Sequence, residues 1–119
     1  MPDFQKLQAL GLDTGEGLLY CAEDPEFYEE MLREYVAEAR AGTEDLEAFF
    51  TARAWDRYAI RAHSVKSTSR MIGARDLSEQ ARGLEAAAKE RDERAVTEAH
   101  GPFLEAYRAL AAGIPEGLA

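Results

Sequence analysis

Apolar residues recur along most of the chain at intervals of three and four positions, which is the period of an amphipathic helix. No segment keeps the alternation of apolar and polar residues that is typical of a half-buried strand. The sequence also contains no internal repeat and no linker long enough to divide it. The pattern therefore predicts an all-α protein, with a single domain over residues 1–119 and a bundle core over about 24–112.

Glycines divide the N-terminal part of the predicted structure. A short helix over residues 4–10 should end at Gly11, where the apolar period stops. Gly15 and Gly17 are expected to keep the residues that follow loose. We expect this N-terminal piece to pack as a lid on the main bundle.

Capping residues predict where the longer helices begin and end. Asp24 before Pro25 predicts a helix over about 25–41, because the carboxylate can accept from free amides while proline at the first position costs no hydrogen bond. Gly42 is expected to close this helix. Thr43 should then cap a third helix.

The second half of the chain contains the same kinds of helix boundary. Asp56 is expected to cap a fourth helix, and Gly73 is expected to end it. A fifth helix over about 77–88 should follow. A sixth should begin near Asp92 and bend at Pro102 without losing its helical phase.

Composition narrows the function classes. The formal charge of −9 argues against nucleic-acid binding, which needs basic residues to replace phosphate counterions. Cys21, the single cysteine, cannot form an internal disulfide, and no secretory signal or run of about 18 apolar residues occurs, so we expect a cytoplasmic protein without membrane contact. No heptad seam remains once the core is assigned, so we expect a monomer.

The charge is unevenly distributed along the chain. Residues 16–50 contain 11 acidic and 2 basic residues, whereas residues 53–75 contain 6 basic and 1 acidic residue. Alternating charges usually only solvate helix faces. The basic segment, however, contains His63, and a local reversal of sign around one histidine is less often accidental.

The fourth predicted helix carries the candidate chemistry. His63 has Lys66 three residues on and Ser67 four residues on, so the three side chains share a patch of helix surface. A neutral imidazole is a nucleophile near physiological pH, and an ammonium attracts an anionic phosphoryl group. On a helical projection His63 points away from the expected core face, which consists of Tyr58, Ala62, Val65, Ser69 and Ile72. The combination predicts an exposed histidine that carries phosphate.

A candidate partner-binding surface surrounds this histidine. Ile60 and Met71 fall on the outer side of the helix near Ser64, where apolar residues need an explanation. They could pack against the N-terminal segment or form a small docking patch. We assign Ala59 and Arg70 to the same predicted surface.

An ordered set of residues resembles the signature of histidine-containing phosphotransfer (HPt) domains. The matching positions are His63, Val65, Lys66, Ser69, Ile72, Gly73, Ala74, Leu77, Leu84 and Glu85. The earlier segment Asp24-Pro25-Glu26-Phe27-Tyr28 is also similar to the family's second helix, so the resemblance covers about residues 16–111. It implies an antiparallel four-helix bundle, here with an additional short N-terminal helix.

The resemblance also implies roles for individual residues. His63 would accept a phosphoryl group on its outer ring nitrogen and exchange it reversibly with the aspartate of a response-regulator receiver domain. Lys66 would offset phosphoryl charge. Glu85 would accept a hydrogen bond from the other nitrogen and orient the ring, unless it is an ordinary solvated glutamate. Magnesium would belong to the receiver, so the chain itself should need no cofactor.

One departure from the family pattern lies beside the histidine. Ser67 stands where the family has glycine, which suggests a need for clearance near the phosphoryl group. Its hydroxyl could bond back to the carbonyl of His63 or turn outward to the phosphate.

Neither a phosphate-binding loop nor a G-x-G-x-x-G motif occurs, so any phosphoryl group must come from another protein and the chain should not act as an enzyme alone. We expect this chain to exchange the phosphoryl group with a receiver domain and with a sensor histidine kinase of the hybrid type. Two alternatives stay open. The chain could be a helical adaptor that binds a receiver or kinase domain without phosphate transfer, or the histidine domain of a chemotaxis-type kinase.

Other chemically active residues lack such neighbours. His100 is expected at the surface or at a helix end beside Gly101. Its spacing from Glu98 does not place two ligands on one helix face, so we expect no metal site. Aromatic residues near the third helix, Phe49, Phe50 and Trp55, are expected to pack at the core and the helix junction.

Overall fold

The computed structural model describes residues 2–118, and these residues form six α-helices and one 3-10 helix without any strand. The all-α prediction is confirmed. The elements are α1 (Phe4–Ala9), α2 (Thr14–Tyr20), α3 (Pro25–Thr51), α4 (Trp55–Met71), α5 (Arg75–Lys89), α6 (Glu93–Gly113) and the 3-10 helix η1 (Ile114–Leu118). Within residues 2–118 no helix is both long enough and apolar enough to cross a membrane.

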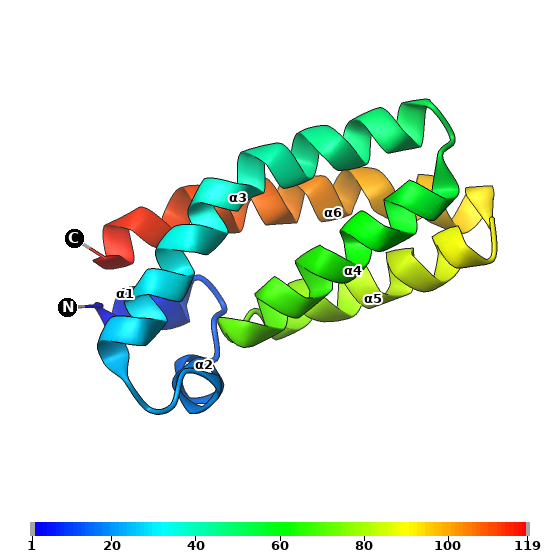
Figure 1. Cartoon of the computed structure of the whole chain (residues 1–119). Helices are drawn as coiled ribbons and strands as arrows, with labels where there is room; N and C mark the ends of the chain where they lie inside the picture. The colour runs from blue at the N-terminus through cyan, green and yellow to red at the C-terminus, as the bar shows by residue number, and fades with distance from the viewer. Residues whose placement is uncertain (1, 119) are drawn as a thin grey trace.

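Four long helices make up the body of the molecule. Figure 1 shows α3, α4, α5 and α6 extending along one axis, with the chain reversing direction at each connection. Helices α3 and α5 each pack against both α4 and α6. Helices α1 and α2 cover one end, where the N-terminal and C-terminal parts of the chain meet (Figure 1) and α1 packs on η1.

Helix α3 is longer than the sequence predicts, because neither Gly42 nor Thr43 interrupts it. A Cβ atom on Gly42 would lie 2.9 Å from the hydroxyl oxygen of Tyr107 on α6. The glycine therefore permits close approach of two helices instead of closing one. Thr43 does not cap a new helix, since its hydroxyl donates to the carbonyl of Arg40 within the same helix.

The residues around Gly15 and Gly17 are not loose, contrary to the prediction from the sequence, but form the helix α2. Asp13 caps it by accepting a hydrogen bond from the amide of Glu16 at 3.0 Å. Gly17 is buried, and a Cβ atom there would lie 2.9 Å from the carbonyl oxygen of Ile72. Close packing of α2 on the end of α4, which short-range sequence patterns do not register, explains this glycine.

The boundaries of α4 and α6 agree with the sequence at most points. Asp56 is an exception, because α4 begins at Trp55 with Ala54 before it, and the Asp56 carboxylate instead accepts from Arg91 at 2.9 Å. Helix α4 ends before Gly73, as predicted. Asp92 caps α6, which continues through Pro102.

Two buried polar side chains, Ser69 and His100, have hydrogen-bond partners in the core. The predicted core face of α4 is buried, and its Ser69 hydroxyl lies 2.8 Å from the hydroxyl of Tyr35. His100 is also buried, so the prediction of a surface position is wrong. Its Nδ1 atom lies 2.8 Å from the Tyr58 hydroxyl, and its ring stacks on Phe50 at 4.0 Å. Burial lowers the pKa of His100, which favours the neutral ring.

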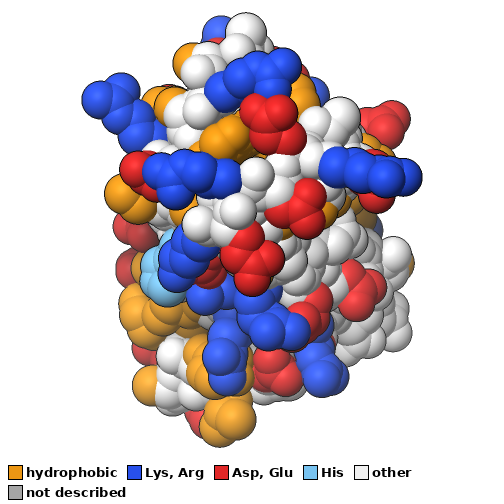
Figure 2. Space-filling view, turned by 90° about the vertical axis from the view of Figure 1, so that its right-hand side faces the viewer, with side chains coloured by type: hydrophobic (Ala, Val, Ile, Leu, Met, Phe, Trp, Pro, Cys, Tyr) orange, Lys and Arg blue, Asp and Glu red, His pale blue; other side chains and the backbone are white. Residues whose placement is uncertain are grey.

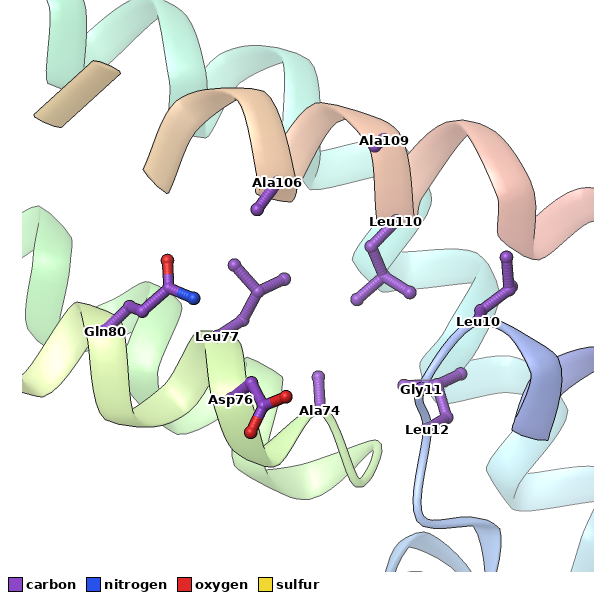
Figure 3. Close-up of a pocket in the computed structure, with 10 residues that line it drawn as sticks. All are labelled: Leu10, Gly11, Leu12, Ala74, Asp76, Leu77, Gln80, Ala106, Ala109 and Leu110. Carbon is purple, nitrogen blue, oxygen red and sulfur yellow. The ribbon is translucent and has the colours of Figure 1, made fainter. Parts of the chain in front are cut away.

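An apolar hollow of about 370 Å³ lies between α5, α6 and the connection that follows α1. Figure 3 shows Leu77 of α5 facing Ala106 and Leu110 of α6, with Leu10 and Leu12 closing one side. None of the site residues predicted from the sequence lines it.

Gly73 provides a test of the connection between α4 and α5. Its φ angle is +84°, and a Cβ atom would overlap the carbonyl oxygen of Asp13. We expect Gly73→Ala to lower the free energy of unfolding by about 2–4 kcal/mol, from backbone strain and the clash together. Gly83→Ala is the matched control, because Gly83 lies inside α5 with nothing within 4 Å of the added atom. It should raise the free energy by about 0.5–1 kcal/mol.

Chemical denaturation measures both variants. Equal effects of the two substitutions would show that the turn at Gly73 does not constrain the fold.

Candidate functional site

His63 lies near the middle of α4, on the side that packs beside α5. Its side chain is 58% exposed, although Ala62 next to it is buried. The imidazole is therefore fixed to a rigid helix and still reachable from outside. This position agrees with the prediction of an exposed histidine.

Glu85 of α5 meets this ring from the inner side. Its Oε2 atom lies 2.9 Å from His63 Nδ1, and its side chain is only 8% exposed. The alternative of an ordinary solvated glutamate is therefore wrong. An ionised carboxylate can only accept hydrogen bonds. Of the two neutral tautomers of His63, the contact therefore favours the one with the proton on Nδ1. That tautomer leaves the lone pair of Nε2 available.

Two ammonium groups keep the buried carboxylate ionised. Lys66 Nζ lies 2.8 Å from Glu85 Oε1, and Lys89 Nζ lies 3.0 Å from Oε2. Burial by itself raises the pKa of Glu85, but hydrogen bonds from Lys66, Lys89 and His63 outweigh burial and bring the pKa down to about 2. The carboxylate thus stays charged at physiological pH.

Lys89 is not among the site residues predicted from the sequence. The spacing of Glu85 and Lys89, four residues apart on one predicted helix, could have suggested the ion pair. Lys66 is predicted to meet only the phosphoryl group, whereas in the structure its ammonium pairs with Glu85.

Ser67 bonds back to its own helix. Its hydroxyl donates to the carbonyl oxygen of His63 at 3.1 Å, which is the first of the two expected arrangements. The side chain is exposed and does not cover the imidazole with a bulky group. Across the helix pair, the Ser78 hydroxyl of α5 donates to the Lys66 carbonyl at 3.1 Å and ties α5 to this turn of α4.

The predicted partner-binding residues differ in exposure. Ile60 is 72% exposed, so it does not pack against the N-terminal segment. Arg70 is exposed, with its guanidinium 5.7 Å from the centre of the Tyr20 ring. Ser64 and Met71 are half-buried, and Met71 packs on the core. Ala59 is buried, so it exposes little area to a partner, and its assignment to the partner surface stays a prediction.

Two hollows of different character follow one another along the α4–α5 pair. One, of about 380 Å³, is lined by Asp56, Ala59, Ile60, His63, Glu85 and Lys89. The other, of about 430 Å³, is lined by Lys66, Ser67, Arg70, Arg75, Ser78 and Arg82, with Glu16, Tyr20 and Glu79. The second hollow therefore carries an excess of positive charge.

Figure 2 views the molecule from the end where α3 meets α4 and α5 meets α6. A histidine side chain is exposed at one edge of this face, and Lys or Arg side chains lie next to it. Among residues 2–118, no group of three or more His, Cys, Asp or Glu side chains is placed to hold a metal ion.

Comparison with known families matches the sequence to a described domain. A family model for the Hpt domain matches residues 30–113, which is more than half of the chain. The chain belongs to the Hpt domain family. Hpt domains carry out histidine phosphotransfer in phosphorelays, together with response regulators and kinases. No curated protein and no solved structure gives a significant match to the chain.

The matched region of this Hpt domain extends from α3 to the end of α6. It contains Glu85 and the three residues that pair with it in the structure, His63, Lys66 and Lys89.

The low pKa of Glu85 predicts how the site affects stability. The pKa of this carboxyl is about 2 in the folded chain, below its ordinary value of 4.5, so its ion pairs stabilise the fold above about pH 4.5. That contribution is lost as the pH falls toward 2. We expect the difference in unfolding free energy between wild type and Glu85→Gln to shrink by about 1–2 kcal/mol between pH 6 and pH 3.

Urea denaturation at each pH measures this difference. Glu105→Gln, at an exposed position of α6, controls for the loss of one negative charge. A gap between wild type and Glu85→Gln that stays constant with pH would contradict the assigned network.

Proposed function

We propose that His63 is the phosphoacceptor of a two-component phosphorelay and exchanges a phosphoryl group reversibly with the aspartate of a receiver domain. The observation that carries this proposal is the hydrogen bond between His63 Nδ1 and buried Glu85, with the ring still 58% exposed. In the forward step Nε2 attacks phosphorus, an N–P bond forms, and the P–O bond to the aspartyl carboxylate breaks. The reverse step returns the phosphoryl group to the carboxylate.

The residues around His63 support this chemistry by position and charge. Phosphoryl transfer passes through a loose transition state, so alignment and charge neutralisation supply most of the catalysis. Lys66 would offset phosphoryl charge from a side chain that is only 26% exposed and is held by Glu85. Ser67 would leave clearance over the imidazole. Magnesium would come with the receiver, and without a partner this chain would catalyse no reaction.

The partner surface follows from the exposed residues near the ring. We infer that a receiver domain docks over Ile60, Ser64, Arg70 and Met71, with its acidic site near the positively charged hollow. Complementary charge favours a fast encounter over tight binding, which suits a transient carrier. The antiparallel four-helix bundle of the family is supported by the order in which α3 to α6 pack. We further propose a hybrid sensor kinase as donor, a cytoplasmic location and a monomeric state.

A labelled receiver tests the assignment of His63. A receiver domain carrying radioactive aspartyl phosphate should transfer label to the wild-type chain, and the bound label should be acid-labile and alkali-stable. His63→Gln should reduce the transferred label to background because the nucleophile is gone. Glu98→Gln removes an exposed carboxylate that pairs with Arg94 on the same helix, α6, so this variant should transfer as wild type does.

Binding of the receiver is measured on the same variants. Label that persists in His63→Gln would contradict the site assignment. Receiver binding without any transfer by the wild-type chain would favour the adaptor instead.

A further inference from the structure

Lys89 is part of the cluster around the imidazole. It lies in the last turn of α5, one helical turn after Glu85. Its Nζ atom is 3.0 Å from Glu85 Oε2, the same oxygen that lies 2.9 Å from His63 Nδ1. Lys66 occupies the other carboxylate oxygen, Oε1, at 2.8 Å. Three donors thus share the two oxygens of one buried carboxylate.

We infer that Lys89 is a positioning residue for the phosphoacceptor, because it and Lys66 clamp opposite oxygens of Glu85 and thereby fix the oxygen that orients His63. This inference rests on the proposed function of His63, which it extends to a residue on the neighbouring helix. Lys89 acts through Glu85 and is not assigned any contact with the phosphoryl group.

The need for a clamp follows from the torsional freedom of glutamate. The last side-chain torsion of a glutamate is broad, so packing alone does not fix the direction of its oxygens. With one ammonium on each oxygen, rotation of this buried carboxylate would break an ion pair. Oε2 is then held toward Nδ1, and the tautomer with a free Nε2 is maintained.

The two lysines line neighbouring hollows along the α4–α5 pair. Lys89 lines the hollow that contains His63 and Ile60, whereas Lys66 lines the positively charged hollow with Ser67 and Arg70. Lys89 is also the more exposed of the two, at 65% against 26%. The carboxylate therefore lies between two cations that approach it from separate hollows.

An ordinary structural role makes a different prediction. A lysine in the last turn of a helix interacts favourably with the helix C-terminus and with a glutamate four residues earlier. That role would change stability alone and would leave the imidazole unaffected. A readout on the ring itself therefore separates the two explanations.

The experiment uses phosphoramidate as a small-molecule donor, so no receiver is needed. In the reaction ammonia leaves phosphorus as an N–P bond forms to His63. The share of neutral His63 rings with the proton on Nδ1 is measured in parallel by ¹⁵N NMR. Lys89→Met is expected to slow phosphorylation about three- to fivefold, the size expected for loss of one partly exposed ion pair, and to lower the Nδ1–H share. Lys89→Arg should restore both.

Two comparisons make the test specific. In a Glu85→Gln background, Lys89→Met should cause no further change, because its effect passes through the carboxylate. Arg94→Met removes an equally spaced exposed pair, Arg94 with Glu98 on α6, and should leave rate and tautomer unchanged.

The inference would be overturned if Lys89→Met kept the wild-type phosphorylation rate and the wild-type Nδ1–H share. It would also be overturned if Lys89→Met had its full effect in the Glu85→Gln background. If the wild-type chain accepts no phosphate, the proposed function fails, but the Nδ1–H share of Lys89→Met still tests the positioning role of Lys89.

Discussion

The hydrogen bond between His63 Nδ1 and Glu85 is the interaction on which the site depends. It joins an exposed imidazole on α4 to a buried carboxylate on α5, and it leaves the outer ring nitrogen available. A buried carboxylate is costly unless cations pair with it, and Lys66 and Lys89 meet that need. The charge cluster and the orientation of the imidazole are therefore one arrangement.

The rest of the fold supplies the alignment that this bond requires. The turn between α4 and α5 is held from outside, because the Tyr28 hydroxyl donates to the carbonyl of Ile72 at 2.9 Å and the Asp13 amide donates to the carbonyl of Gly73 at 2.9 Å. The start of α3 and the N-cap of α2 thus hold the turn. Since each residue of α5 is placed relative to α4 by that turn, these two contacts contribute to where Glu85 meets His63.

Local patterns in the sequence predicted the parts of this structure that local physics determines. The helical period identified the core face of α4 and the outward direction of His63, and Gly73 marked the helix end. Features that depend on distant partners were missed. Gly42 lies against Tyr107 and His100 against Tyr58, so their environments follow from helix packing. The pairing of Lys66 with Glu85 across two helices is likewise set by tertiary contact.

Identifying the ring nitrogen that carries phosphate is the decisive measurement for the role proposed for Glu85. Phosphorus–nitrogen couplings in NMR spectra of the ¹⁵N-labelled, phosphorylated chain distinguish the two nitrogens of His63. Because Nδ1 is engaged by Glu85, we expect phosphate on Nε2 alone. Phosphate on Nδ1, or on neither nitrogen of this ring, would show that the role is wrong.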